Sequence, residues 1–262
     1  MPMRIGAHVD QSDAITQAQA LGADVAQIFL SDPQSWKGPE WTYPGGAEAL
    51  RADAAAADLR LVVHAPYVIN VASTNNRIRI PSRKLLQKIM DGASQVGAAG
   101  VVVHGGHVTA ADDPAKGFDN WRKAVESLET DVPVLIENTA GGDHSMARRL
   151  DRIAQLWDAV TAASGDVEVG FTLDTCHAHA GGIDLADAVT AVRGITGRID
   201  LVHANGSIGA FDSGQDRHTT FVEGTIDPEA LVALVRAADA PVVCETHASA
   251  PDDVAWLRAR VG

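Results

Sequence analysis

Cysteine is scarce in this 262-residue chain, which contains only Cys176 and Cys244. Two cysteines in a chain of this length do not make the disulfide framework of a small secreted protein, so a reducing cytosol is the expected compartment. We expect both to be small buried packing residues rather than thiolate ligands.

Long apolar runs are also missing, and none reaches the roughly 18–20 residues that a membrane-spanning helix needs. The first residues enter a strand pattern at once, without the charged and apolar regions of a signal peptide. We therefore expect a cytoplasmic protein with no membrane partner.

Basic residues are outnumbered, since 21 Lys and Arg stand against 34 Asp and Glu, a formal net charge of −13. This balance argues against a general nucleic-acid-binding protein, which is usually basic, but it allows a local basic surface. Carboxylates that bind cations also count as negative in this sum. Aromatic residues make up only 5% of the chain, and against that background ten histidines are conspicuous.

Short β-branched runs alternate with longer Ala- and Leu-rich segments along the whole chain. We expect strands at residues 4–8, 23–30, 61–64, 100–104, 132–137, 167–174, 199–203 and 241–245. We expect helices at residues 12–22, 46–58, 82–98, 117–130, 145–164, 185–196, 227–237 and 252–260. Continuous apolar strands are typical of a parallel sheet covered by helices.

This alternation predicts an α/β fold, a closed (β/α)₈ TIM barrel that forms a single domain over residues 1–262. The competing architecture is an open doubly wound sheet. It would usually carry a glycine-rich phosphate loop after its first strand, and residues 6–9 do not form one.

Six successive strands, the third to the eighth, each finish with a residue that can bind a metal. These residues are His64, His104, Glu137, Asp174, His203 and Glu245. The carboxyl ends of barrel strands gather around one mouth, so we expect these side chains to meet there. A single one could be a hydrogen-bonded loop residue, but six in succession predict a metal centre.

Residues after the sixth and seventh strands add further candidates, His177 and the run 216–218 with Asp216 and His218. The segment that follows Asp174 is interpreted as a small-residue loop carrying the imidazoles of His177 and His179. An alternative for Asp174 and His177 is a hydrogen-bonded pair that caps the next helix.

The donor types restrict the metal. Mixed imidazole and carboxylate ligands without cysteine suit Zn²⁺, Mn²⁺ or Fe²⁺ better than Ca²⁺ or Mg²⁺. Nine ligands are too many for one ion, so we expect two or three, with Glu137 available to bridge. Close cations suit phosphodiester cleavage, because they bind phosphate oxygens, lower the pKa of an attacking water and stabilise the leaving oxygen.

The motifs together resemble those of endonuclease IV, the metal-dependent apurinic/apyrimidinic endonuclease family. The similar segments are IGAHV at 5–9, HAPYVIN at 64–70, VHGGH at 103–107, IENTAG at 136–141, LDTCH at 173–177, HAN at 203–205, DRH at 216–218 and ET at 245–246. Of these, the segments at 173–177 and 216–218 are the most specific.

The resemblance implies a TIM barrel with three Zn²⁺ ions, Mn²⁺ or Fe²⁺ being possible at some positions. It implies a first ion on His64, His104 and Glu137. Glu137 would bridge to a second ion, also held by Asp174, His203 and Glu245, and would be the catalytic residue. The third ion would be held by His177, Asp216 and His218.

The family activity implied is hydrolysis of the phosphodiester 5′ to an abasic site in double-stranded DNA by a metal-activated hydroxide. The products would be a 3′-hydroxyl and a 5′-deoxyribose phosphate, and blocked 3′ ends would also be trimmed. The expected state is a monomer.

The expected DNA contacts are less regular. The family often carries Lys-Asn-Pro-Arg-Gln-Trp after the second strand, and that arginine enters the DNA stack, whereas residues 31–37 have Gln34 in its place. Tyr67 is retained, and Trp36 and Trp41 could stack on bases or anchor the loop.

A basic run at residues 77–88 carries five basic residues and no acidic one. An ordinary solvated helix start is the alternative, but its position after the third strand leads us to expect Arg77 and Arg79 to contact DNA phosphates.

Two other functions remain open. A sugar or sugar-phosphate isomerase or epimerase of the xylose-isomerase-like barrels would share the architecture, but it would not need His177, Asp216 and His218. A DNA-lesion binder could keep metals for structure alone. The sequence assigns no role to His8, His107 or His179.

Overall fold

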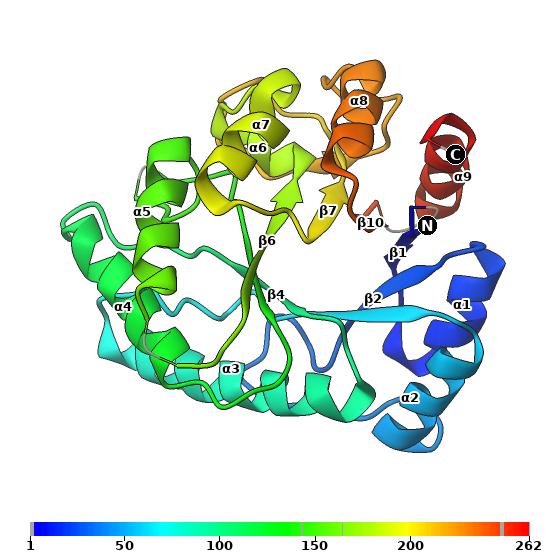
Figure 1. Cartoon of the computed structure of the whole chain (residues 1–262), viewed down its shortest axis with the longest axis horizontal. Helices are drawn as coiled ribbons and strands as arrows, with labels where there is room; N and C mark the ends of the chain where they lie inside the picture. The colour runs from blue at the N-terminus through cyan, green and yellow to red at the C-terminus, as the bar shows by residue number, and fades with distance from the viewer. Residues whose placement is uncertain (1–2, 143, 164, 247–248, 262) are drawn as a thin grey trace.

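Eight parallel strands close into a barrel with helices outside it (Figure 1). The computed structural model describes residues 3–142, 144–163, 165–246 and 249–261. The strand order around the barrel is β1-β10-β7-β6-β5-β4-β3-β2. The strands are β1 (Ile5–His8), β2 (Val25–Phe29), β3 (Arg60–His64), β4 (Val101–His104), β5 (Val134–Glu137), β6 (Val169–Asp174), β7 (Leu201–Ala204) and β10 (Val242–Cys244). The predicted α/β TIM barrel is confirmed.

The helices pack around the barrel and bury their apolar faces against the outside of the strands. They are α1 (Ala14–Ala20), α2 (Gly46–Ala56), α3 (Asn76–Val96), α4 (Pro114–Glu126), α5 (Leu150–Thr161), α6 (Thr175–Gly181), α7 (Leu185–Thr196), α8 (Pro228–Ala238) and α9 (Ala250–Val261). A 3₁₀ turn, η1 (Gln11–Asp13), precedes α1, and β8 (Gly206–Ser207) pairs antiparallel with β9 (His218–Thr219). Among the described residues, no helix has the length and hydropathy to cross a membrane.

Two helix starts differ from the expected ones by five residues or more. Helix α3 begins at Asn76 rather than at residue 82, because the Asn75 side chain caps it by accepting a hydrogen bond from the Arg77 amide. Pro81 lies inside α3 without ending it. Helix α5 begins at Leu150 rather than at residue 145. The residues before it hydrogen-bond instead to the loop after β4, where the Met146 amide donates to the Gly106 carbonyl.

The prediction of a loop after Asp174 is wrong, because this segment forms helix α6. Asp174 is its N-cap, and its Oδ1 atom accepts a hydrogen bond from the His177 amide at 2.6 Å. Gly182 ends the helix with a left-handed backbone, φ 82°, which glycine adopts without steric cost. The capping pair considered as an alternative is therefore present.

Inside the barrel, an apolar layer supports a polar one. Six side chains, one from each of six strands, form an apolar cluster separate from the main core: Val25, Val62, Val102, Leu135, Leu201 and Val243. Side chains alternate between the two faces of a strand, so the residue two positions further along points the same way. Those residues are Gln27, His64, His104, Glu137, His203 and Glu245. The barrel thus carries five of the candidate ligands in a layer directly above an apolar floor.

Candidate metal centre

The structure gathers the predicted ligands at the carboxyl ends of the strands. Potential ligand atoms of His64, His104 and Glu137 all lie within 4.8 Å of one another. Those of Glu137, Asp174, His203 and Glu245 do the same, so Glu137 belongs to both groups. We call the nine expected ligands the ligand cluster: His64, His104, Glu137, Asp174, His177, His203, Asp216, His218 and Glu245.

The third expected group is assembled around Asp216. His177 Nε2 lies 3.1 Å from Asp216 Oδ2, and His218 Nε2 lies 3.2 Å from Asp216 Oδ1. Asp174 also groups with His177 and His218, and its Oδ2 atom is 3.8 Å from His218 Nε2. The Cys176 thiol lies near Asp216 and His218, although it is buried and forms no disulfide. Asp174 is therefore within reach of both the second and the third expected ions.

Two imidazoles are oriented for metal binding by backbone carbonyls. His64 Nδ1 lies 2.7 Å from the Ala65 carbonyl oxygen, and His177 Nδ1 lies 2.9 Å from that of Asn138. A carbonyl oxygen only accepts hydrogen bonds, so Nδ1 carries a proton in both rings and Nε2 is the nitrogen that would bind a cation. These Nε2 atoms face Glu137 and Asp216, respectively.

Glu137 provides a test of whether a cation fits. Its Oε2 atom is buried and has no hydrogen-bond partner among the described residues. It nevertheless lies 3.4 Å from His64 Nε2 and 3.2 Å from His104 Nε2. A buried carboxylate oxygen costs free energy unless something compensates its charge. A cation bound by these three atoms would supply that compensation, so the residues fit a metal.

The electrostatics of the cluster point the same way. Burial alone would lower the pKa of His203, but the Glu245 and Glu137 carboxylates raise it to about 9. Burial would also lower the pKa of His218, yet Asp216 and other groups raise it to about 11. Burial would raise the pKa of Glu245, and His203 and other imidazoles lower it to about 2. The carboxylates thus keep the neighbouring imidazoles protonated and positively charged. Bound cations would take the place of these protons and supply the positive charge instead.

Buried amides hold the ligands, and sequence reasoning missed them. Asn138 Nδ2 donates to the Asp174 carbonyl, and its Oδ1 accepts from the Asp174 amide at 2.8 Å. Asn205 Nδ2 donates to Asp174 Oδ2 at 2.7 Å and to Glu245 Oε2 at 3.1 Å. Both follow a ligand closely in the sequence, within two residues of Glu137 and His203. That proximity, together with burial, is the signal that could have identified them.

Tyr67 forms one wall of the site. Tyr67 is 51% exposed, and its ring stacks on His104 with centroids 5.6 Å apart and meets His64 edge-on at 5.4 Å. Burial of the hydroxyl and the nearby carboxylates, Glu245 first, raise its pKa. Tyr67 therefore covers two ligands while offering an exposed surface, and its predicted DNA contact stays a prediction.

The loop after β2 exposes two of its expected DNA-contacting residues. Gln34 is exposed on a turn in which its amide donates to Asp32 Oδ1 at 2.9 Å. Trp36 is 47% exposed, whereas Trp41 packs against the core. Of the two stacking candidates, the structure therefore leaves Trp36 accessible and uses Trp41 to anchor the loop.

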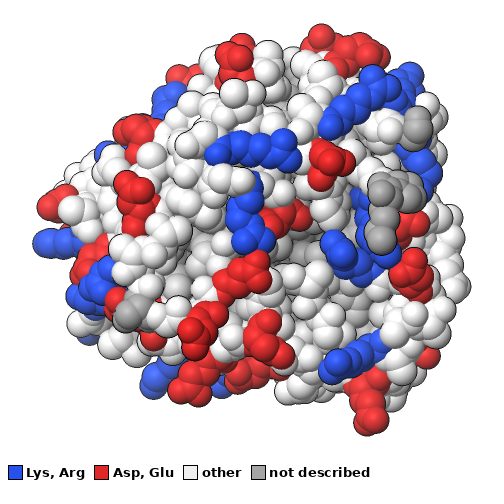
Figure 2. All heavy atoms as spheres, viewed as in Figure 1, with Lys and Arg blue, Asp and Glu red and all other residues white. Residues whose placement is uncertain are grey.

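The two arginines at the start of α3 differ in their surroundings. Arg77 is exposed, but the Arg79 guanidinium donates to the carbonyls of Ser73 and Thr74 at 3.0 and 3.1 Å, and also to the Asn76 side chain. Arg79 thus anchors the loop before α3, and its expected phosphate contact is untested. On the face that Figure 2 shows, basic side chains lie in several separate groups interspersed with acidic ones.

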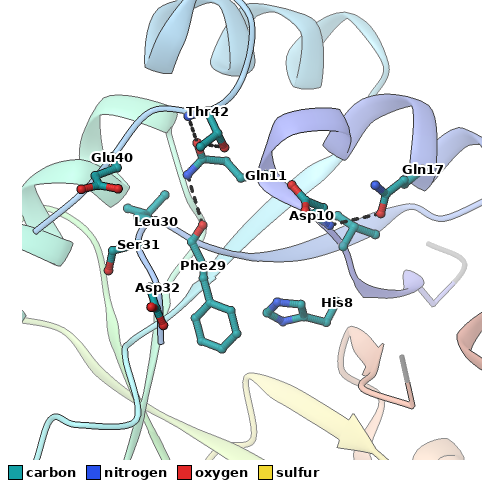
Figure 3. Close-up of a pocket in the computed structure, with 11 residues that line it drawn as sticks. His8, Asp10, Gln11, Gln17, Phe29, Leu30, Ser31, Asp32, Glu40 and Thr42 are labelled. Atoms are coloured by element: carbon teal, nitrogen blue, oxygen red, sulfur yellow. Dashed lines mark hydrogen bonds between the residues drawn. The ribbon is translucent and has the colours of Figure 1, made fainter. Parts of the chain in front are cut away.

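A cavity of about 490 Å³ opens beside the ligand cluster, between the segments that follow β1 and β2 (Figure 3). Gln11 holds its walls together, since its Nε2 donates to the Phe29 carbonyl at 3.1 Å and its Oε1 accepts from the Thr42 amide at 2.6 Å. His8 lines the cavity and lies against the Phe29 ring, with centroids 4.5 Å apart. His8 also contacts Gln27 in the polar layer, with 3.1 Å between His8 Nδ1 and Gln27 Nε2.

Comparison with known proteins identifies the family. The family model described as a xylose isomerase-like TIM barrel matches residues 15–260. A protein of Mycobacterium tuberculosis (strain ATCC 25177 / H37Ra), named "Probable endonuclease 4", is 56% identical over 261 residues, which are 99% of this chain and 100% of that protein. The chain belongs to the endonuclease IV family. This membership confirms the resemblance that the motifs indicated.

Solved structures agree with endonuclease IV membership. Endonuclease IV from Thermus thermophilus is 30% identical, with a TM-score of 0.81, over 98% of this chain and 97% of that chain. A D-tagatose 3-epimerase-like protein is 18% identical, with a TM-score of 0.74, over 98% of this chain and 95% of that chain. At that lower identity, the epimerase-like protein shares the fold alone.

Proposed function

We propose that this chain is an apurinic/apyrimidinic endonuclease, which hydrolyses the phosphodiester bond 5′ to an abasic site in double-stranded DNA. The products would be a 3′-hydroxyl and a 5′-deoxyribose phosphate, and the enzyme would also trim blocked 3′ ends. The observation that carries the proposal is Glu137, a buried carboxylate shared by two groups of potential metal ligands at the mouth of the barrel.

We assign three Zn²⁺ ions to the ligand cluster, with Mn²⁺ or Fe²⁺ as possible occupants of some positions. The first set is His64, His104 and Glu137, the second Glu137, Asp174, His203 and Glu245, and the third His177, Asp216 and His218. When bound, the ions would hold phosphate oxygens, lower the pKa of an attacking water and stabilise the leaving oxygen.

The chain's own residues would fix this arrangement in advance. Glu137 would join the first two sets, because its two oxygens face different imidazoles: Oε2 faces His64 and His104, and Oε1 lies 3.0 Å from His203 Nδ1. Asn205 holds one oxygen of Asp174 and one of Glu245, so both carboxylates keep their direction when substrate binds.

Residues around the cluster would bind and orient the DNA. Tyr67 would cover His64 and His104 on the solvent side and present its exposed ring to the abasic sugar. Gln34 and Arg77 would contact the duplex from the loop after β2 and from the start of α3. Arg79 would hold the loop that positions Arg77. It would contact a phosphate through any guanidinium N–H group that the loop does not use.

One assay tests the proposal. A labelled duplex with a single abasic analogue is incubated with the protein before and after prolonged chelation and after zinc is added back. The proposal requires incision 5′ to the lesion, loss of incision on chelation and its recovery with zinc. Incision at no position, by protein that has retained its metals, would overturn it.

The same assay separates the two alternatives. A DNA-lesion binder would shift the abasic duplex in a gel without cutting it. An isomerase or epimerase would neither bind nor cut the duplex. It would also not need the third ligand set, His177, Asp216 and His218. We further propose that the chain acts as a monomer with a single TIM-barrel domain, in the cytoplasm and at the nucleoid when bound to DNA.

A further inference from the structure

Gln27 is a buried amide in the same barrel layer as the ligands. It lies on β2, two residues after Val25 of the apolar floor, and its side chain is fully buried. Its amide contacts residues from three other strands: His8 on β1, His203 on β7 and Glu245 directly after β10. A buried amide in an otherwise apolar strand costs free energy unless all its hydrogen bonds are made.

The hydrogen bonds of Gln27 fix its orientation. Glu245 Oε1, a carboxylate oxygen that accepts hydrogen bonds, lies 2.7 Å from one end of the amide, so that end is the Nε2 donor. The second Nε2 hydrogen points to His8 Nδ1 at 3.1 Å. The amide oxygen then faces His203 Nε2 at 2.7 Å, and Nε2 of His203 must donate to it.

This arrangement determines which nitrogen of His203 can bind a cation. With the proton on Nε2, the lone pair is on Nδ1, which lies 3.0 Å from Glu137 Oε1 and 3.3 Å from Glu245 Oε2. His203 is therefore oriented in the opposite sense to His64 and His177, whose Nδ1 atoms face backbone carbonyls.

We propose that Gln27 is a positioning residue of the metal centre, which selects the Nδ1 lone pair of His203 and holds Glu245 for the same ion. The inference rests on the proposed metal centre. Partners that orient metal ligands typically contribute 10- to 100-fold to metal affinity, so removing Gln27 is expected to weaken one ion by about that factor.

The chain supplies a matched control. Gln11 is also a buried glutamine beside the mouth, 7% exposed, and it also makes hydrogen bonds at both ends of its amide. Its described partners, Phe29 and Thr42, are not in the ligand cluster. Gln11→Met and Gln27→Met each remove the hydrogen bonds of a buried amide, but only Gln27→Met releases His203 and Glu245.

The test measures zinc binding rather than activity. Wild type, Gln27→Met and Gln11→Met are loaded with Zn²⁺ and titrated with a competing chelator, and retained ions are counted by native mass spectrometry. One ion of Gln27→Met should dissociate at a free zinc concentration about 10- to 100-fold higher than in wild type, and Gln11→Met should match wild type. Equal affinities in wild type and Gln27→Met, or equal losses in both variants, would overturn the inference.

A measurement on the unmodified protein covers the case in which Gln27→Met does not fold. Nitrogen-15 spectra of histidine-labelled, zinc-loaded wild type should show His203 bound through Nδ1 with a proton on Nε2, and His64 and His177 bound through Nε2. Binding of His203 through Nε2 would refute the role of Gln27. Neither readout uses DNA, so wild type that binds zinc but does not cut would contradict the proposed function and leave this inference standing.

Discussion

His177 and His179 lie two residues apart on α6, yet their side chains face different surroundings. His177 Nε2 lies 3.1 Å from Asp216 Oδ2, within the ligand cluster. His179 Nε2 lies 3.2 Å from the Gly209 carbonyl and 3.2 Å from the Thr225 hydroxyl, and its ring meets the exposed Phe211 edge-on. His179 therefore anchors the segment after β8, a role that the sequence did not assign.

The two histidines make a matched pair for mutation. His177→Ala should reduce the number of bound ions by one, because it removes a nitrogen that faces Asp216. His179→Ala should keep the full number of ions and lose about 1 kcal/mol of unfolding free energy, since it removes only hydrogen bonds and packing. Metal analysis and urea unfolding of both variants check this, and a lost ion in His179→Ala would count against the assignment.

Glu137 should be indispensable for activity. Glu137→Gln removes the negative charge that two ligand groups share, and we expect incision of an abasic duplex to fall by more than about 100-fold, beyond the loss typical for a residue that only orients a ligand. Circular dichroism should show an intact barrel. Glu168→Gln is the control, since Glu168 is about half exposed, precedes β6 and pairs with Arg198 at the opposite end of the barrel. Retained activity in Glu137→Gln would remove Glu137 from the bridging role.

Arg77 should contribute to DNA binding through its charge. Arg77→Glu is expected to weaken binding of the abasic duplex and to make the slope of log K against log salt shallower by about 1, because one phosphate contact is lost. Arg236→Glu, an exposed substitution in the last turn of α8, should leave the slope unchanged. A slope in Arg77→Glu equal to that of wild type would contradict the contact.

Arg79→Glu should behave differently from Arg77→Glu. It breaks the hydrogen bonds to Ser73 and Thr74, so it should lower stability as well as affinity. Urea unfolding of the two variants separates these effects, and equal stabilities would show that Arg79 does not anchor the loop.

Removal of the metals should destabilise the fold. Metal that binds only the native state stabilises it by about 4 kcal/mol per site when its free concentration is about 1,000-fold above Kd. For a chain of this size that corresponds to a fall in Tm of at least about 8 °C on chelation. Differential scanning calorimetry of loaded and chelated protein gives the result, and an identical Tm in both states would show that the cluster does not bind metal tightly.

The alternation of apolar strand and helix patterns was enough to predict most of the fold from the sequence. Strand positions and the residues at their ends follow from apolar runs, and the closed barrel then brings His64, His104 and Glu137 together as expected. Helix limits were less accurate where a cap or a tertiary contact decides them, as at Asn75 and in the segment before α5. Helix α6 was missed because its small residues and glycines suggest a loop, although Asp174 is a good N-cap.

The partners of the ligands could be predicted only in part. Gln27 occupies the same position relative to Val25 as His64 does relative to Val62, so the alternation placed it in the polar layer. It was overlooked because an amide is not a common metal ligand. The approach of Asp174 to His218 could not be predicted, because it depends on how the loop between β8 and β9 folds back over the mouth.

We assign nine side chains at the barrel mouth to one centre for three metal ions. Native mass spectrometry of gently purified protein supplemented with zinc tests it most directly. We expect a main species that carries three divalent ions in the wild type, and one that carries two in His177→Ala. A wild-type protein that retains no ion, or no more than one, at micromolar free zinc would contradict it.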